Sequence, residues 1–190
     1  FEGVQQPEPS SFQEGLALTG VAFFFAAIGI AIAYLIYRRG LRAPDHDLAA
    51  RIRRRLSRDR ADIVAFASEL IAIPSENPPG DHYAQCATVI ARWLRDLGLK
   101  VRTMNPSKRG PCIAGTFGDR GRALYFSGHY DVVPAQQRSQ FNPVVRKTNL
   151  HGRGAADMKG GVAAMAFAIR ALAESGFEPK GRLISVSVPD

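Results

Sequence analysis

The chain has 190 residues, of which 46% are apolar and 22% are charged, so its composition is that of a folded globular protein and excludes a disordered or fibrous one. Its two cysteines are too few for a disulfide-stapled scaffold, and they form no CxxC motif or Cys/His cluster of the kind that holds a structural zinc ion. The formal net charge of +8 is concentrated, because residues 38–60 hold nine arginines against three aspartates, whereas residues 1–15 hold three glutamates and no base.

An acidic flank, residues 1–14, precedes a run of 23 uncharged residues over 15–37. A helix of this length crosses the hydrocarbon core of a bilayer, and no basic residues precede it as they would in a cleaved signal peptide. The run therefore predicts one transmembrane helix, and the alternative, a buried helix of a globular core, is argued against by its length. Because arginines follow the run, the positive-inside rule predicts a single-pass membrane protein with the rest of the chain in the cytoplasm. The letters FEGV and GIAIAYLIYRRG also resemble a late transmembrane helix of the antiporter-like large subunit of respiratory complex I.

Residues 38–60 form a basic segment in which leucine and isoleucine recur at helical spacing after Pro44. The pattern predicts a basic linker that contains an amphipathic helix. Such a helix can lie against anionic lipid headgroups, or it can be a solvated linker with its charges in water, and the sequence leaves both alternatives open. No aromatic side chain stands between the arginines to stack on a base, which argues against nucleic-acid binding.

Residues 61–190 alternate between helical and strand periodicity and are expected to form the soluble domain. Strand, helix and strand joined by a right-handed crossover predict an α/β fold with helices packed on a central mixed sheet. The expected helices are 61–73, 83–97 and 160–176, the expected strands are 99–104, 112–117, 123–129 and 183–188, and an irregular loop is expected over 134–153.

The first segment that could carry chemistry is SGHYDVVP, in which a predicted strand ends at His129 and Asp131 follows two residues later. Neutral imidazole is a good ligand for a divalent metal, and a ligating histidine usually donates its second ring N–H to a carboxylate. His-x-Asp supplies both groups, although such a pair at a strand end is by itself more often an ordinary loop pair.

The second segment is GRGAADMKGG, which places Asp157 in a glycine-rich turn before a helix. A carboxylate at such a turn can reach a metal held by a neighbouring strand, or it can simply cap the helix. The glycine spacing matches neither phosphate-binding pattern, and an acidic residue at the turn would repel a phosphate.

Together the two segments resemble the N-terminal signatures of the dinuclear zinc hydrolase family that contains aminoacylase, acetylornithine deacetylase, succinyl-diaminopimelate desuccinylase and carboxypeptidase G. The IPSENPPG turn belongs to the same resemblance. It implies a zinc aminopeptidase-like catalytic domain with two Zn²⁺, for which Co²⁺ or Mn²⁺ could substitute. It further implies that His129 is a metal ligand, that Asp157 bridges both metals, and that Asp131 is the catalytic-site carboxylate that orients His129.

The resemblance also implies what lies beyond the chain. In the family, two glutamates, a general base and a metal ligand, follow the strand that here runs into Asp190, and a lid domain comes later. We therefore expect residues 61–190 to be the N-terminal part of an enzyme that cleaves an amide or peptide bond of a small N-acyl amino acid or peptide. This fragment is expected to be inactive alone, and the enzyme can form a homodimer through the lid domain. The rival interpretation is a non-enzymatic, complex I-like membrane segment fused to a truncated hydrolase domain.

Overall fold

The structure is a computed structural model that describes residues 46–106 and 110–189. The N-terminal flank, the predicted transmembrane helix over 15–37 and the segment that resembles a complex I helix lie outside the described residues, as does Asp190. Over the ranges that are described, no helix is both long enough and apolar enough to cross a membrane.

A four-stranded mixed sheet forms the centre of the described chain, in the order β1-β2-β6-β3. Strands β1 (Lys100–Met104) and β2 (Cys112–Phe117) pair antiparallel, and β2 also pairs antiparallel with β6 (Arg182–Val188). Strand β3 (Ala123–His129) runs parallel to β6, with His129 opposite Val188. The predicted α/β fold with a mixed sheet is thus confirmed.

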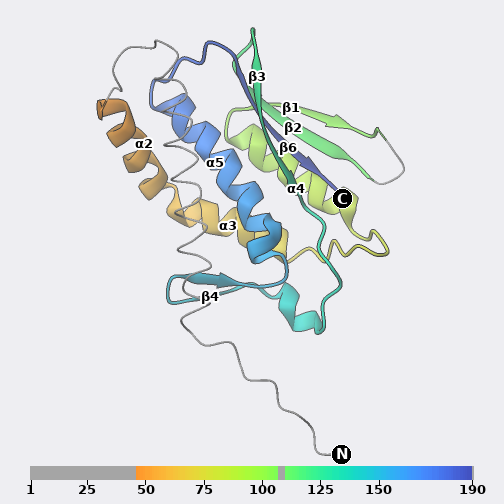
Figure 1. Cartoon of the computed structure of the whole chain (residues 1–190). Helices are drawn as coiled ribbons and strands as arrows, with labels where there is room; N and C mark the ends of the chain where they lie inside the picture. The colour runs from red at the N-terminus through yellow and green to blue at the C-terminus, as the bar shows by residue number, and fades with distance from the viewer. Residues whose placement is uncertain (1–45, 107–109, 190) are drawn as a thin grey trace, which may run out of the picture. The chain divides into compact units, whose positions relative to one another are not determined.

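Helices α4 (Tyr83–Asp96) and α5 (Gly160–Glu174) cover the same face of this sheet (Figure 1). Gly115 of β2 lies against Leu94 of α4, and Gly128 of β3 lies against Met165 of α5. A Cβ atom on Gly128 would stand 2.7 Å from the terminal methyl group of Met158 and 2.8 Å from that of Met165, so a larger residue here would force these methionine side chains to shift. This close packing matters for the site, because His129 is the next residue along β3.

Helix α3 (Arg60–Ile71) completes the apolar core by packing against α4 and α5. Phe66 of α3 stacks on Trp93 of α4 at 4.9 Å between ring centroids, and Phe167 of α5 lies 6.0 Å from the same indole. Both phenylalanines are fully buried. Aromatic contacts of this kind fix the three helices to one another, and the C-terminal end of α3 is thereby held near the start of α5.

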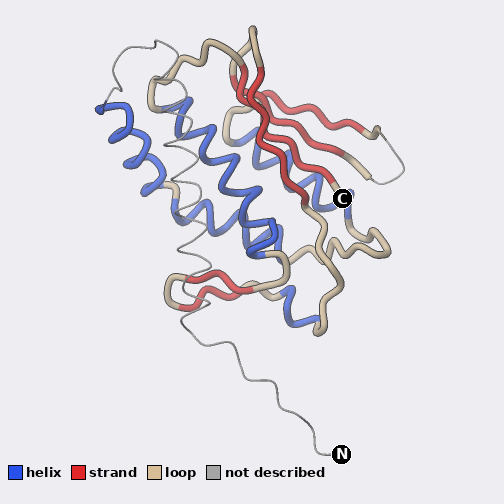
Figure 2. The backbone as a smooth tube through the Cα atoms, viewed as in Figure 1, coloured by secondary structure: helices blue, strands red, loops and turns tan. Residues whose placement is uncertain are grey.

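The stretch predicted as an irregular loop over 134–153 contains regular structure instead (Figure 2). A short 3₁₀ helix, η1 (Arg138–Phe141), is followed by a hairpin of β4 (Val144–Arg146) and β5 (Asn149–His151). The prediction was wrong here because strands of three residues are too short to show the alternation that identifies longer strands.

Helix α2 (His46–Arg58) lies within the basic segment and packs on the domain that follows it. Arg51 Nε donates to the Ser175 carbonyl at 2.9 Å, and Arg55 pairs with both Asp59 and Glu174. A helix in this segment is confirmed. Two of its arginines are used against α5 and its neighbours, whereas Arg53, Arg54 and Arg58 are exposed.

Candidate metal centre

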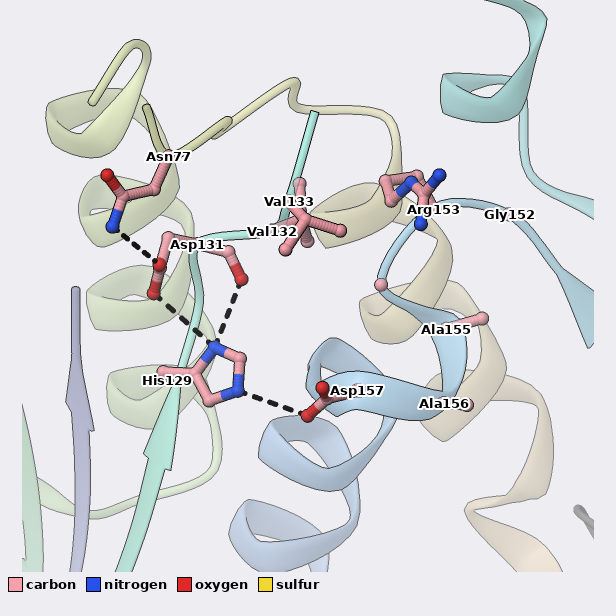
Figure 3. A pocket seen from close by; sticks show the side chains of 11 residues that line it. Asn77, His129, Asp131, Val132, Val133, Gly152, Arg153, Ala155, Ala156 and Asp157 are labelled. Carbon is pink, nitrogen blue, oxygen red and sulfur yellow. Dashed lines mark hydrogen bonds and ion pairs between the residues drawn. The ribbon is translucent and has the colours of Figure 1, made fainter. Parts of the chain in front are cut away.

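His129 is the last residue of β3, and both of its ring nitrogens face aspartate oxygens (Figure 3). Nδ1 lies 3.1 Å from the Asp131 backbone carbonyl and 3.4 Å from Asp131 Oδ1, while Nε2 lies 3.1 Å from Asp157 Oδ1. Burial lowers the pKa of His129, but the interactions with Asp157 and Asp131 outweigh it and raise the pKa above its ordinary value. The imidazole is therefore held between the two carboxylates that the sequence singled out.

Asp131 is only 5% exposed and lies in the turn after β3. The Asn77 side-chain amide donates to Asp131 Oδ2 at 3.3 Å. The backbone of this turn is bound to the segment around Ser75, because Val132 N donates to the Ser75 carbonyl at 2.9 Å and Asn77 N donates to the Val132 carbonyl at 2.8 Å. Asp131 thus approaches His129 through a turn held from outside, a contact that strand alternation alone does not specify.

Asp157 lies in η2 (Ala155–Lys159), a short irregular turn that leads into α5. Gly154 opens this turn with φ of 81°, in the left-handed region, and a Cβ there would stand 2.5 Å from Val132. Asp157 itself has extended backbone angles, and its side chain is 87% exposed. The carboxylate therefore projects from the turn toward His129 and is open to a ligand.

Lys159 anchors the turn that carries Asp157. Its side chain is fully buried, and Nζ donates to the carbonyls of Leu70 and Ile73 at 2.8 and 2.6 Å. Burial lowers the pKa of Lys159 to about 8, an effect that Cys86 and Asp131 partly oppose. Leu70 is in the last turn of α3 and Ile73 lies just beyond the helix. The Leu70 carbonyl also accepts from Ile73 N and the Ile73 carbonyl from Ser75 N, so the ammonium group is a further donor to each.

The side chains of His129, Asp131 and Asp157 border an open pocket of about 480 Å³. Its wall combines polar and charged side chains with small and branched apolar ones. The lining residues are Asn77, His129, Asp131, Val132, Val133 and residues 152–157.

The positions of His129 Nε2 and Asp157 Oδ1 fit two ligand atoms of a divalent metal ion. Two ligand atoms of a tetrahedral zinc lie about 3.3 Å apart when each is about 2.05 Å from the metal, and His129 Nε2 and Asp157 Oδ1 are 3.1 Å apart. Imidazole and carboxylate suit Zn²⁺, Co²⁺ and Mn²⁺ alike. Within residues 46–106 and 110–189 no group of three or more His, Cys, Asp or Glu side chains could hold a metal. The described residues thus offer two ligands for such an ion.

Comparison with known proteins agrees with this geometry. Residues 125–190 match peptidase family M20/M25/M40. The chain carries part of an M20 peptidase domain. This confirms the predicted family of zinc-dependent amidohydrolases and metallopeptidases, whereas the resemblance to a complex I helix finds no support. The individual roles of His129, Asp131 and Asp157 stay predictions.

The M20 domain is similar to succinyl-diaminopimelate desuccinylase of Alkalilimnicola ehrlichii, with 36% identity over 135 residues that cover 68% of this chain and 35% of that protein. It is also similar to N-formyl-4-amino-5-aminomethyl-2-methylpyrimidine deformylase of Halalkalibacterium halodurans, with 29% identity over 142 residues, 70% of this chain and 33% of that protein. The chain thus spans about one third of the length of these relatives.

The fold is also that of solved peptidases. Human carnosine dipeptidase 1 superposes with a TM-score of 0.61 at 23% identity, over 73% of this chain and 34% of that one. Dug1p, a dipeptidase of Saccharomyces cerevisiae, gives a TM-score of 0.62 at 19% identity, over 74% of this chain and 34% of that one. At this level of identity the likeness concerns the fold.

Proposed function

We propose that the protein containing this chain is a metal-dependent hydrolase that cleaves an amide or peptide bond of a small N-acyl amino acid or peptide. The observation that carries the proposal is the facing pair of His129 Nε2 and Asp157 Oδ1 at the wall of the pocket, with Asp131 behind the imidazole. The relatives support it, because their names describe removal of a succinyl group and of a formyl group.

In this proposal His129 and Asp157 hold divalent metal, two Zn²⁺ or alternatively Co²⁺ or Mn²⁺, with Asp157 shared between the ions. When bound, such ions polarise the scissile carbonyl and lower the pKa of a water molecule. Asp131 keeps the imidazole in the tautomer whose Nε2 lone pair points into the pocket. The exposed edge of Asp157 and the apolar Val132 and Val133 leave room beside it for a small substrate.

The proposal further places the general base in an acidic pair that follows Asp190. Strands β3 and β6 are parallel, and His129 pairs with Val188. Residues that follow β6 therefore begin next to His129, at the edge where the carboxyl ends of parallel strands form ligand sites.

Hydrolysis is tested by assaying the full-length protein against N-acyl amino acids and dipeptides with zinc present. We expect the protein to release the free amine. This activity should disappear when a chelator is added and return when zinc is restored, because an ionised water and a polarised carbonyl both depend on the metal. The 190-residue chain alone is expected to be inactive. Turnover by that chain, or failure of the zinc-loaded full-length protein on every amide, would overturn the proposal.

We also propose that residues 15–37 anchor the protein in a membrane as a single span, with the hydrolase domain in the cytoplasm. The chain should stay with membranes after a high-salt wash, because burial of an apolar helix is not weakened by salt. Removal of residues 1–40 should release it. Extraction of the intact chain by salt alone would instead assign the attachment to the arginines of residues 38–60. Membrane and small substrate are then the proposed partners, together with a homodimer formed through the lid domain.

A further inference from the structure

Residues 75–77 run beside the turn that carries Asp131, and they bind it at several points. Glu76 and Val132 form a parallel bridge, flanked by the hydrogen bonds from Val132 N to the Ser75 carbonyl and from Asn77 N to the Val132 carbonyl. Ser75, which is fully buried, adds a bond of 2.7 Å from its hydroxyl to the Tyr130 carbonyl. The main chain on both sides of Asp131 is therefore fixed by this short segment.

One of these contacts reaches the Asp131 carboxylate itself. Asn77 Nδ2 donates to Oδ2 at 3.3 Å, while the other oxygen, Oδ1, lies 3.4 Å from His129 Nδ1. The two oxygens are thus divided between two neighbours, one on each side, as Figure 3 shows. A carboxylate rotates easily about its terminal torsion, which has broad minima. A donor on one oxygen is what fixes the direction of the other.

Two acceptors of Asp131 lie at Nδ1 of His129, the backbone carbonyl at 3.1 Å and Oδ1 at 3.4 Å, and both favour a proton on this nitrogen. Neutral imidazole has one N–H, and a proton shared by Nδ1 with Asp131 leaves Nε2 with a free lone pair. Nε2 is the atom that faces Asp157. A carboxylate that rotated away would weaken the preference for this tautomer and with it the preformed ligand pair.

We propose that Asn77 is a positioning residue of the metal centre, which holds the Asp131 carboxylate so that His129 presents Nε2 to the metal. The inference rests on the proposed function. In the sequence, Asn77 looks like turn chemistry before two prolines; its role as a donor to Asp131 becomes visible only in the structure, because the two residues are 54 positions apart.

The test compares Asn77→Leu, which keeps the size of the side chain but removes its donor, with Ser75→Ala as a matched control. Ser75→Ala removes a hydrogen bond between the same two segments without touching the Asp131 carboxylate. Zn²⁺ and Co²⁺ dissociation constants are measured by titration of the purified protein. Nitrogen-15 NMR of His129 in the metal-free protein gives the tautomer, and urea unfolding gives the stability of each variant.

We expect Asn77→Leu to weaken metal binding by about 10-fold, the lower end of the effect of losing a group that orients a ligand, because the Asp131 backbone carbonyl still accepts from Nδ1. The preference of His129 for the Nδ1–H tautomer should weaken in this variant. Ser75→Ala should lower the urea midpoint and leave both the tautomer and the metal affinity as in the wild type. Unchanged affinity and tautomer in Asn77→Leu would overturn the inference, and so would equal losses of affinity in the two variants. The His129→Ala variant distinguishes failure of the proposed metal site from failure of the role given to Asn77. If His129→Ala keeps its metal, the proposed metal site is wrong. If His129→Ala loses metal and Asn77→Leu does not, only the positioning role of Asn77 is wrong.

Discussion

Replacing His129 by alanine is expected to abolish turnover and to lower the amount of bound zinc. The substitution removes the imidazole that ends β3 and leaves Asp157 as the one proposed ligand among the described residues at this wall of the pocket. One carboxylate gives far weaker chelation than a carboxylate and an imidazole placed 3.1 Å apart. Metal analysis of the purified variant, together with the amide hydrolysis assay, measures both effects.

Asp131→Asn belongs to the same experiment and should be milder. The amide keeps the size of the side chain but loses the charge that favours the Nδ1 proton of His129. A loss of metal affinity of about 10-fold to 100-fold is expected, less than that of His129→Ala. His151→Ala, which removes the histidine at the end of β5, is the control variant, and this protein should bind as much zinc as the wild type. Wild-type zinc content and turnover in His129→Ala would remove His129 from the site.

Lys159→Ala is expected to produce the largest loss of stability among single substitutions near the site. It removes one of the donors to each of two carbonyls at and just after the end of α3, and it leaves a cavity where a fully buried stem had packed. Part of the loss is offset because a buried charge is no longer desolvated. The free energy of unfolding should fall by about 2–5 kcal/mol, the range for large-to-small substitutions in a core.

Urea unfolding checks this value, with Lys180→Ala as the control. Lys180 is exposed, and its removal should change the free energy of unfolding by less than about 0.5 kcal/mol. Lys159→Met keeps most of the aliphatic stem but not the donor, so its free energy of unfolding should lie between those of Lys159→Ala and Lys180→Ala. Equal stability of Lys159→Ala and Lys180→Ala would show that the buried ammonium does not hold the turn to α3.

The elements that frame the site were predictable from local patterns. Strand β3 was expected over 123–129 and has these bounds, and α5 begins at the expected Gly160, because alternation and helical spacing are properties of neighbouring residues. His129, Asp131 and Asp157 were recognised as a set because of the two motifs, and the structure brings them together.

The contacts that hold these three residues were not predictable in the same way. Asn77 and Lys159 bind atoms 54 and 86–89 positions away, and no local period reports such a pairing. The partners of both residues depend on how α3 and the segment after β3 pack. The β4–β5 hairpin was missed for the opposite reason, since its strands are too short to carry a pattern.

The dependence of these hydrogen bonds on helix packing has a consequence for the order of folding. A side-chain hydrogen bond forms only when donor and acceptor lie at the right distance and angle, so we expect the bonds from Asn77 and Lys159 to form after α3, α4 and α5 have paired. Substitutions that weaken only such late contacts accelerate unfolding and leave the folding rate nearly unchanged. The protein would then acquire its fold first and its capacity to bind metal last, and a metal ion present during folding would slow the reopening of the site without guiding the chain toward it.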